Sequence, residues 1–276
     1  DSKEVVLSAL DGKDGETTFK VSSKILELSA YSSRSGGAVV LMRDITEKCE
    51  RERMRNVYTA NVSHELKTPI TTIMGFSELL ENPKIEREKV TDFASEINKE
   101  ALRLRDIVGD IIELSSLDEG YKGENEEINV RNAVESEIKK LEHKAKDSCV
   151  SIENGVSSSL LINGIPKVFS EVISNLLDNA IRYNKKGGWV KVESKEMDGK
   201  VEISVSDNGI GIPKESIERV FERFYRVDKS RSRESGGTGL GLSIVKNGME
   251  RMGGEVRVES TQGEGSVFTL TFPLNH

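Results

Sequence analysis

Apolar and polar positions divide the chain into three regions with different spacing. Residues 1–46 favour β-structure, because the stretches TTFKVSSKIL and GGAVVLMRDIT are rich in β-branched residues and are separated by the turn-prone SSRSGG. About forty residues of this kind predict a hairpin or a meander, which is only marginally stable alone.

The second region is helical. The charged stretch EKCERERMRNVYTANVSHEL has no Gly or Pro and predicts a helix up to Lys-Thr-Pro, with a bend at Pro69. Its charge run fits a solvated helix face and a coiled-coil linker equally well. ENPKIERE breaks the pattern, and a second helix is predicted over about residues 88–117.

Apolar residues of this second helix alternate by four and three, which is the spacing of a helical bundle seam. They are Val90, Ala94, Ile97, Ala101, Leu104, Val108 and Ile111. An antiparallel hairpin of two helices cannot bury this seam alone, so the pattern predicts a homodimer that forms a four-helix bundle.

The third region mixes helices and strands and follows the polar, Gly-bearing stretch LDEGYKGENEE. Helices are predicted at residues 131–147, 165–183, 214–221 and 239–252, and strands at WVKVESKE, VEISVSD, EVRVES and SVFTLTF. Helices combined with antiparallel hairpins predict an α+β sandwich of one sheet and one helical layer. The expected domains are therefore residues 1–46, 47–118 and 126–276, with a linker at 119–125.

Composition excludes several classes of protein. The 276 residues carry a net charge of −7, with a pI near 5.3, which argues against direct binding of nucleic acid. The longest apolar run, AVVLM, is too short to span a bilayer, and no secretion signal is present. Two cysteines a hundred positions apart favour a reducing compartment. Because the sequence starts without Met, we expect a soluble cytoplasmic fragment, whose parent is compatible with an anchor on the cytoplasmic face of a membrane.

One predicted helix carries a line of polar residues. Glu171, Asn175, Asn179 and Arg182 recur at i, i+4, i+8 and i+11, within an arc of about 80°, and apolar residues occupy the opposite side. Carboxylate and amide oxygens suit Mg²⁺ that keeps waters and phosphate oxygens as further ligands. An ordinary amphipathic surface helix is the alternative, although Lys and Glu would be expected there.

Two glycine-rich segments follow. Asp207 ends a strand in SVSDNGIGIP, a pattern that on its own is also an everyday turn. GGTGLGLSIVKNG leads into a helix whose first N–H groups can bind an anion, and it matches neither a Walker A loop nor a dinucleotide-binding fingerprint. A basic stretch precedes it, and the two together predict a lid over a polyphosphate. The basic residues are Arg219, Arg223, Arg226, Lys229, Arg231 and Arg233.

These segments, in this order, resemble the N, G1, F and G2 boxes of the sensor histidine kinases of two-component systems. Their ATP-binding (Bergerat or GHKL) fold is shared with Hsp90, type II topoisomerases and mismatch-repair ATPases. VSHELKTPI resembles the H box of the HisKA dimerisation domain. VFERFYRVDKSRSRESGGTGLGLSIVK is similar to the lid of the phosphate-regulon and cell-wall sensor kinase group, and residues 1–46 are similar to the last strands of a PAS domain. The resemblance covers about residues 47–276.

The resemblance implies roles for individual residues. His64 would be the phosphoacceptor, Glu65 would orient and deprotonate it, and Thr68 would hold the attacking water when the kinase dephosphorylates its partner. Asn175 would be the main Mg²⁺ ligand, supported by Glu171 and Asn179. The ATP-binding residues would be Asn175, Asn179, Arg182, Tyr183, Asp207 (on the adenine amino group), Gly209, Gly211, Lys229, Arg231, Gly237, Thr238, Gly239, Leu240 and Gly241.

The implied function is ATP-dependent autophosphorylation of His64 in a homodimer. Phosphoryl transfer to an aspartate of a response regulator receiver domain would follow, together with phosphatase activity toward that regulator. One alternative is a nucleotide-gated signalling scaffold that acts mainly as a response-regulator phosphatase. Another is a nucleotide-driven clamp with Glu171 as hydrolytic base, which would leave the segment around His64 without a role.

Overall fold

The computed structural model describes residues 2–34, 36–82, 85–118, 123–197, 199–227 and 237–273. The chain divides into two compact units, residues 1–65 and 66–276. Within the described ranges, no helix combines the length and the apolar character needed to cross a lipid bilayer.

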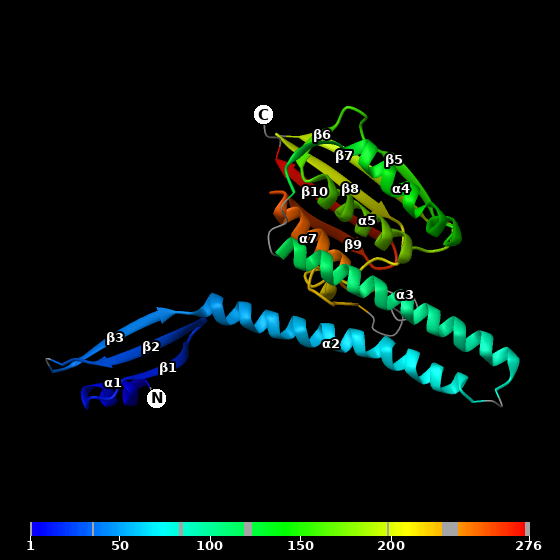
Figure 1. Cartoon of the computed structure of the whole chain (residues 1–276). Coiled ribbons are helices and arrows are strands. Elements are labelled where there is room, and N and C mark those ends of the chain that lie inside the picture. The colour runs from blue at the N-terminus through cyan, green and yellow to red at the C-terminus, as the bar shows by residue number, and fades with distance from the viewer. Residues whose placement is uncertain are drawn as a thin grey trace. The chain divides into compact units, whose positions relative to one another are not determined.

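The first unit contains a helix and a three-stranded antiparallel meander in the order β1-β2-β3 (Figure 1). Its elements are α1 (Ser2–Leu10), β1 (Gly15–Val21), β2 (Lys24–Ser32), β3 (Ala38–Asp44) and the start of α2 (Thr46–Leu80). Ala9, Leu28 and Ala30 form its small core. Strands in this order are what the resemblance to the end of a PAS domain implies.

The predicted meander is confirmed, but one expectation for this region was wrong. Residues 2–10 form a helix rather than a strand, because Val5 and Val6 pack with Ala9 against the sheet. TTFKVSSKIL contributes to two of the strands, and Val21 pairs with Lys24 across a tight turn. The turn is possible because Ser22 adopts φ 53°, in the left-handed region.

A polar junction connects β3 to α2. Asp44 Oδ1 accepts hydrogen bonds from the backbone N–H of Thr46 (3.1 Å) and from its hydroxyl (2.6 Å). The Thr46 Oγ1 in turn accepts one from the backbone N–H of Ile25 (2.8 Å). These bonds and the Lys24 ammonium lower the pKa of Asp44 to about 2, and the start of the helix is thereby tied to the sheet.

α2 does not end at Lys-Thr-Pro as predicted but runs past Pro69 to Leu80. A proline removes a single helix N–H, and the helix tolerates this loss here. α3 (Arg87–Asp118) follows, and the rings of Phe76 and Phe93 lie 5.2 Å apart near the connection between the helices. The predicted hairpin of two long helices is confirmed.

The rest of the second unit is a mixed sheet covered on one face by helices (Figure 1). The five strands run in the order β5-β7-β8-β10-β9, with β5 parallel to β7 and the other pairs antiparallel. The elements are β4 (Glu126–Asn129), α4 (Val130–Asp147), β5 (Ser151–Gly155), β6 (Leu161–Gly164), α5 (Pro166–Arg182), β7 (Trp189–Met197), β8 (Lys200–Asp207), η1 (Lys214–Ser216), α7 (Gly241–Arg251), β9 (Glu255–Thr261) and β10 (Gly265–Pro273). This is the predicted α+β sandwich.

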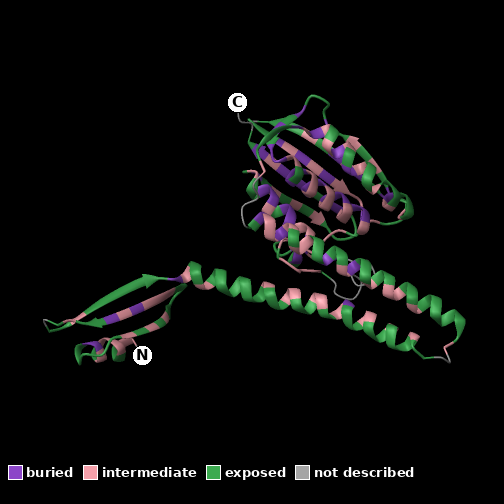
Figure 2. Ribbon diagram, viewed as in Figure 1, coloured by how far each residue is buried: buried purple, intermediate pink, exposed green. Residues whose placement is uncertain are grey.

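The core lies between the helices and the sheet. Figure 2 shows buried stripes along α4, α5 and α7, whereas α2 is mostly exposed. Phe169, Ile173 and Leu177 of α5 are fully buried against strands such as β8 and β10. Burial of each such side chain contributes roughly 2 kcal/mol. α5 is therefore held rigidly along its apolar side.

The helix predicted over 214–221 was wrong. Only Lys214–Ser216 forms a short 3-10 turn, and most of the hydrogen bonds that follow join residues three apart. This tighter path places the Phe221 ring edge-on to Phe268 of the sheet and lets the Tyr225 hydroxyl donate a hydrogen bond to Ser216 Oγ (2.9 Å). The three short strands β4, β5 and β6 were not predicted.

Candidate functional site

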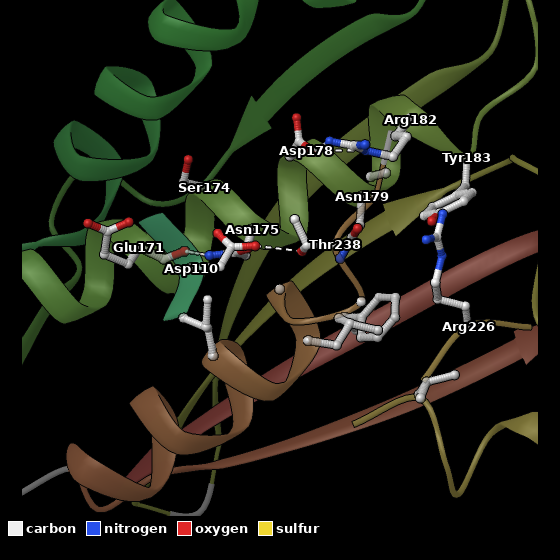
Figure 3. Close-up of a pocket in the computed structure, with 18 of the residues that line it drawn as sticks. Asp110, Glu171, Ser174, Asn175, Asp178, Asn179, Arg182, Tyr183, Arg226 and Thr238 are labelled. Carbon is white, nitrogen blue, oxygen red and sulfur yellow. Dashed lines mark hydrogen bonds and ion pairs between the residues drawn. The ribbon is translucent and has the colours of Figure 1, made fainter. Parts of the chain in front are cut away.

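A cavity of about 1430 Å³ opens beside α5 within the second unit. Its walls come from α3, α4, α5, the segment after β8, the segment after η1 and the glycine-rich loop before α7 (Figure 3). Most of the predicted binding residues line it: Glu171, Asn175, Asn179, Arg182, Tyr183, Asp207, Gly211, Gly237, Thr238, Gly239 and Gly241.

The polar line on α5 faces this cavity because the opposite side of the helix is in the core. Pro166 begins the helix, where its missing N–H costs nothing. The Asn175 side-chain amide donates to the backbone carbonyl of Glu171 (2.9 Å), which leaves its oxygen directed to the cavity side. The ordinary amphipathic helix is therefore a poor description of α5.

Asp207 lies at the end of β8, next to the end of α5. Burial raises the pKa of the Asp207 carboxyl, and backbone N–H groups of Gly209 and Ser266 partly offset the rise. A side chain at Gly209 would place its Cβ 2.4 Å from the Tyr183 carbonyl oxygen, so only glycine permits this close approach. Gly209 does not line the cavity; it fixes Asp207 by donating to Oδ1 (2.8 Å).

The glycine-rich loop passes so close to α5 that side chains would not fit. A Cβ at Gly241 would lie 2.6 Å from Asn175 Oδ1, and one at Gly237 would lie 3.0 Å from the Tyr183 hydroxyl. Gly239 has φ +76°, and its carbonyl accepts a hydrogen bond from the N–H of Phe224 (2.8 Å). The N-terminus of α7 therefore faces the amide of Asn175 across a narrow space that suits phosphate.

Thr238 and Leu240 support this loop in different ways. The Thr238 hydroxyl donates to Asp110 of α3 (2.5 Å) and accepts from the backbone N–H of Leu240 (3.2 Å). Leu240 is fully buried and lies outside the cavity lining. It anchors the loop in the core.

Asp110 and Glu113 of α3 also line the cavity, and the sequence did not predict them as site residues. Burial, aided by Asp106, raises the pKa of Asp110 to about 6 against the effect of the Thr238 hydrogen bond. Burial and the neighbouring carboxylate of Glu171 also raise the pKa of Glu113. Both residues sit in a helix that reads as a bundle seam, and only tertiary packing brings them to the cavity.

The end of α3 is tied to two other segments. Asp118 accepts hydrogen bonds from Arg223 (2.8 and 2.9 Å) and from the side-chain amide of Asn247 in α7 (3.1 Å). These contacts join the end of α3 to α7 and to the segment after η1. No sequence motif predicts these contacts.

The basic stretch divides among several partners. Arg219 pairs with Glu222 and lies over the Tyr225 ring, 4.3 Å from its centroid. Arg226 lines the cavity and points toward Tyr183 in Figure 3. Lys229 and Arg231 lie outside the described residues.

His64 and its neighbours lie on α2. The imidazole is 76% exposed, and its Nδ1 lies 3.9 Å from Glu65 Oε1, so the carboxylate is adjacent to one ring nitrogen. Thr68 follows four positions later in the same helix, and its backbone carbonyl accepts from the Thr72 hydroxyl (3.1 Å).

The donor set of the cavity limits its metal chemistry. No three His, Cys, Asp or Glu side chains within the described ranges are arranged to hold a metal ion. One carboxylate and the amide oxygens on α5 fit a hard cation that takes its remaining ligands from water and phosphate. The close approach of Gly241 to Asn175 leaves room for small groups only at this end.

Comparisons with known proteins match the segment that carries His64 and the segment that forms most of the cavity to two different families. Residues 54–120 match the family described as the His Kinase A (phospho-acceptor) domain. Residues 164–276 match the family described as Histidine kinase-, DNA gyrase B-, and HSP90-like ATPase.

Similar proteins extend the likeness over nearly all of the chain. The sensor-like histidine kinase SenX3 of Mycolicibacterium smegmatis is 38% identical over 272 residues, which cover 98% of this chain and 70% of the relative. The sensor histidine kinase WalK of Bacillus subtilis is 31% identical over 277 residues, 99% of this chain and 45% of the relative. The chain thus spans about half the length of WalK.

Solved structures show the same fold. The histidine kinase ThkA, solved in complex with the response regulator protein TrrA, has a TM-score of 0.64 and 25% identity, covering 99% of this chain and 83% of that one. The histidine kinase AdeS of Acinetobacter baumannii has a TM-score of 0.62 and 23% identity, covering 77% of this chain and 98% of that one.

Proposed function

We propose that this chain, which belongs to the sensor histidine kinases, uses ATP to phosphorylate its own His64 and then passes the phosphoryl group to an aspartate of a response regulator. The observation that supports this most directly is the placement of the polar line of α5 opposite the N-terminus of α7, with no room for a side chain at Gly241. This arrangement suits the phosphates of ATP.

The ATP-binding chemistry divides along the cavity. Asp207 accepts a hydrogen bond from the adenine amino group, and Tyr183 contacts the adenosine. Arg182, the lid cations Lys229 and Arg231, and the loop from Gly237 to Gly241 bind the phosphates. Asn175 would hold Mg²⁺, together with Glu171 and Asn179. Mg²⁺, when bound, neutralises charge on the phosphate oxygens.

His64 provides the nucleophile. Glu65 is adjacent to Nδ1, so it holds the proton there and the neutral imidazole attacks through Nε2. A P–N bond forms as the bond between the γ-phosphorus and the bridging oxygen breaks, and ADP leaves with that electron pair. Glu65 stabilises the imidazolium charge that develops on the ring.

The response regulator is the second substrate. Its aspartate takes the phosphoryl group from phospho-His64, and the ThkA–TrrA complex is a precedent in a similar protein. Thr68 lies one helical turn after His64. In the phosphatase activity it holds the water that hydrolyses the phosphorylated regulator. The domains that serve these steps are residues 47–118 and 126–276, joined by 119–125, with 1–46 as a PAS-like input.

The exposed seam of the long helices supports a homodimer. In one chain Val90, Ala94, Ala101 and Val108 of α3 are exposed, as are Met74 and Leu79 of α2. A second copy would cover them as a four-helix bundle.

The test is autophosphorylation with γ-labelled ATP and Mg²⁺. We expect an acid-labile, base-stable label that His64→Ala abolishes. His143→Ala is the matched control, because His143 is an exposed histidine on α4, and it should keep the label. Nucleotide binding without His64-dependent label would favour the alternative, a nucleotide-gated scaffold that acts mainly as a response-regulator phosphatase.

A further inference from the structure

We infer that Asp178 is a positioning residue for the phosphate-binding end of the cavity, where it holds Arg182 and brings Lys144 of α4 in as a further cation. This inference rests on the proposed function in one respect, that the cavity binds a nucleotide. Neither Asp178 nor Lys144 belongs to the polar line that the sequence pattern singled out.

Asp178 stands between two cations from different helices. Its Oδ2 accepts hydrogen bonds from Arg182 Nε (3.2 Å) and Nη2 (2.7 Å), as Figure 3 shows. Its Oδ1 accepts from the Lys144 ammonium. All three residues line the cavity, and the Asp178 and Arg182 side chains are only 25% and 18% exposed.

The contact fixes the direction of the guanidinium. Because Asp178 takes Nε and Nη2, the other corner of the group, Nη1, is turned toward the glycine-rich loop. Nη1 lies 3.8 Å from the point where a Cβ on Gly237 would be. An anion between α5 and this loop would meet the guanidinium in a fixed orientation.

The same carboxylate makes it possible for two cations to share this wall. Lys144 and Arg182 would otherwise repel each other in a partly buried place. Burial works against the ionised carboxyl, but the two cations outweigh it and keep the pKa of Asp178 below its usual value. Lys144 is thereby held at the cavity although α4 contributes little else to it.

Two opposite effects make the role testable. The negative charge of Asp178 repels phosphate, so a bystander carboxylate would weaken nucleotide binding, and its removal would strengthen it. A positioning residue has the opposite effect, because its removal lets Arg182 and Lys144 rotate away. The direction of the change in affinity therefore separates the two roles.

The experiment compares ADP with adenosine, both with Mg²⁺, by calorimetric titration of the full chain. For Asp178→Asn we expect the dissociation constant for ADP to rise roughly fivefold or more, and that for adenosine to change less than twofold. Asp178→Glu should restore part of the ADP affinity. Glu142→Gln is the matched control, because Glu142 pairs with Lys146 on α4 (2.6 Å) outside the cavity lining.

A lysine pair on α4 gives a second, independent arm. Lys144→Met should weaken ADP binding and leave adenosine binding unchanged, whereas Lys146→Met should change neither. In an Arg182→Gln background, Asp178→Asn should have a much smaller effect than in the wild type. The two lysine variants carry the test if Asp178→Asn fails to fold.

Unchanged or tighter ADP binding in Asp178→Asn, or in Lys144→Met, would overturn the inference. A wild-type chain that binds neither adenosine nor ADP would instead overturn the proposed function. The two failures are therefore distinguishable in one set of titrations.

Discussion

Thr238 donates a hydrogen bond of 2.5 Å to Asp110 Oδ2 and so joins the glycine-rich loop to α3 across 128 positions of the chain. The same hydroxyl accepts from the backbone N–H of Leu240, whose side chain is fully buried. One threonine thus connects the loop, the helix and the core. Removal of its hydroxyl should therefore destabilise the end of α3.

Thr238→Val keeps the shape of the side chain and removes the hydroxyl. We expect the free energy of unfolding to fall by about 1–2 kcal/mol, because the partly buried Asp110 carboxyl loses a hydrogen-bond donor. Hydrogen exchange in the nucleotide-free chain should become faster at the end of α3. Thr71→Val is the control, since its hydroxyl donates a hydrogen bond within α2, to the Lys67 carbonyl (2.9 Å). Equal exchange in both variants would contradict a role for the Thr238 bond.

Asp110 should make stability depend on pH. Its pKa of about 6 in the folded chain lies above the value of about 3.9 in an unfolded one, so the folded state binds more protons between these values. The stabilisation is complete below about pH 4 and is lost as the pH rises through about 6.

Asp110→Asn keeps an acceptor for Thr238 and does not titrate. Relative to wild type, its free energy of unfolding should therefore increase by about 2 kcal/mol between pH 4 and pH 7.5. Chemical denaturation at several pH values measures this difference. Asp92→Asn, at an exposed position earlier on the same helix, should show little of it. A difference that stays constant with pH would show that Asp110 is not the responsible group.

Two glycines with similar backbone angles should respond differently to alanine. Gly211 has φ +64°, and a Cβ there would lie 2.1 Å from the Thr261 carbonyl oxygen. Gly187 has φ +75°, with nothing within 4 Å of its Cβ position. We expect Gly187→Ala to cost about 1 kcal/mol of backbone strain, and Gly211→Ala at least about 3 kcal/mol, because a clash is added. Thermal unfolding compares them, and similar losses would refute the clash.

Glu65→Gln tests the carboxylate beside His64. The amide cannot stabilise an imidazolium, so the rate of autophosphorylation should fall roughly 100-fold. KM for ATP should not change, because no residue before Arg105 in the described part of the chain lines the cavity. Glu52→Gln, an exposed position earlier in α2, serves as control. A rise in KM with an unchanged turnover number would mean that Glu65 acts on nucleotide binding instead.

The sequence predicted those parts of the site that depend on local patterns of residues. Helical spacing placed Glu171, Asn175 and Asn179 on one face of α5. Runs of glycine marked the places where backbone approaches side chains, as Gly241 does at Asn175. Each of these signals spans fewer than fifteen residues, so no knowledge of tertiary structure was needed.

The missing parts depend on contacts between distant segments. Asp110 and Glu113 belong to a regular bundle pattern, and only the packing of α3 against α7 buries them. The charged segment at 214–221 has good helix formers, but the contact of Phe221 with Phe268 selects a tighter path. The contact between Asp178 and Arg182 was predictable from the sequence, because Asp and Arg four positions apart on a helix can form an ion pair. That spacing was not used in predicting the site.

The sheet order has a consequence for how the protein is made. β10, the last strand in the sequence, lies between β8 and β9 rather than at an edge. A ribosome that delivers the chain from its N-terminus can release helices and the β7–β8 hairpin early, but the sheet has a gap until β10 emerges. A product that stops before Gly265 would lack an interior strand and leave β8 with an open edge prone to aggregation. The sheet is therefore complete only once β10 has been synthesised.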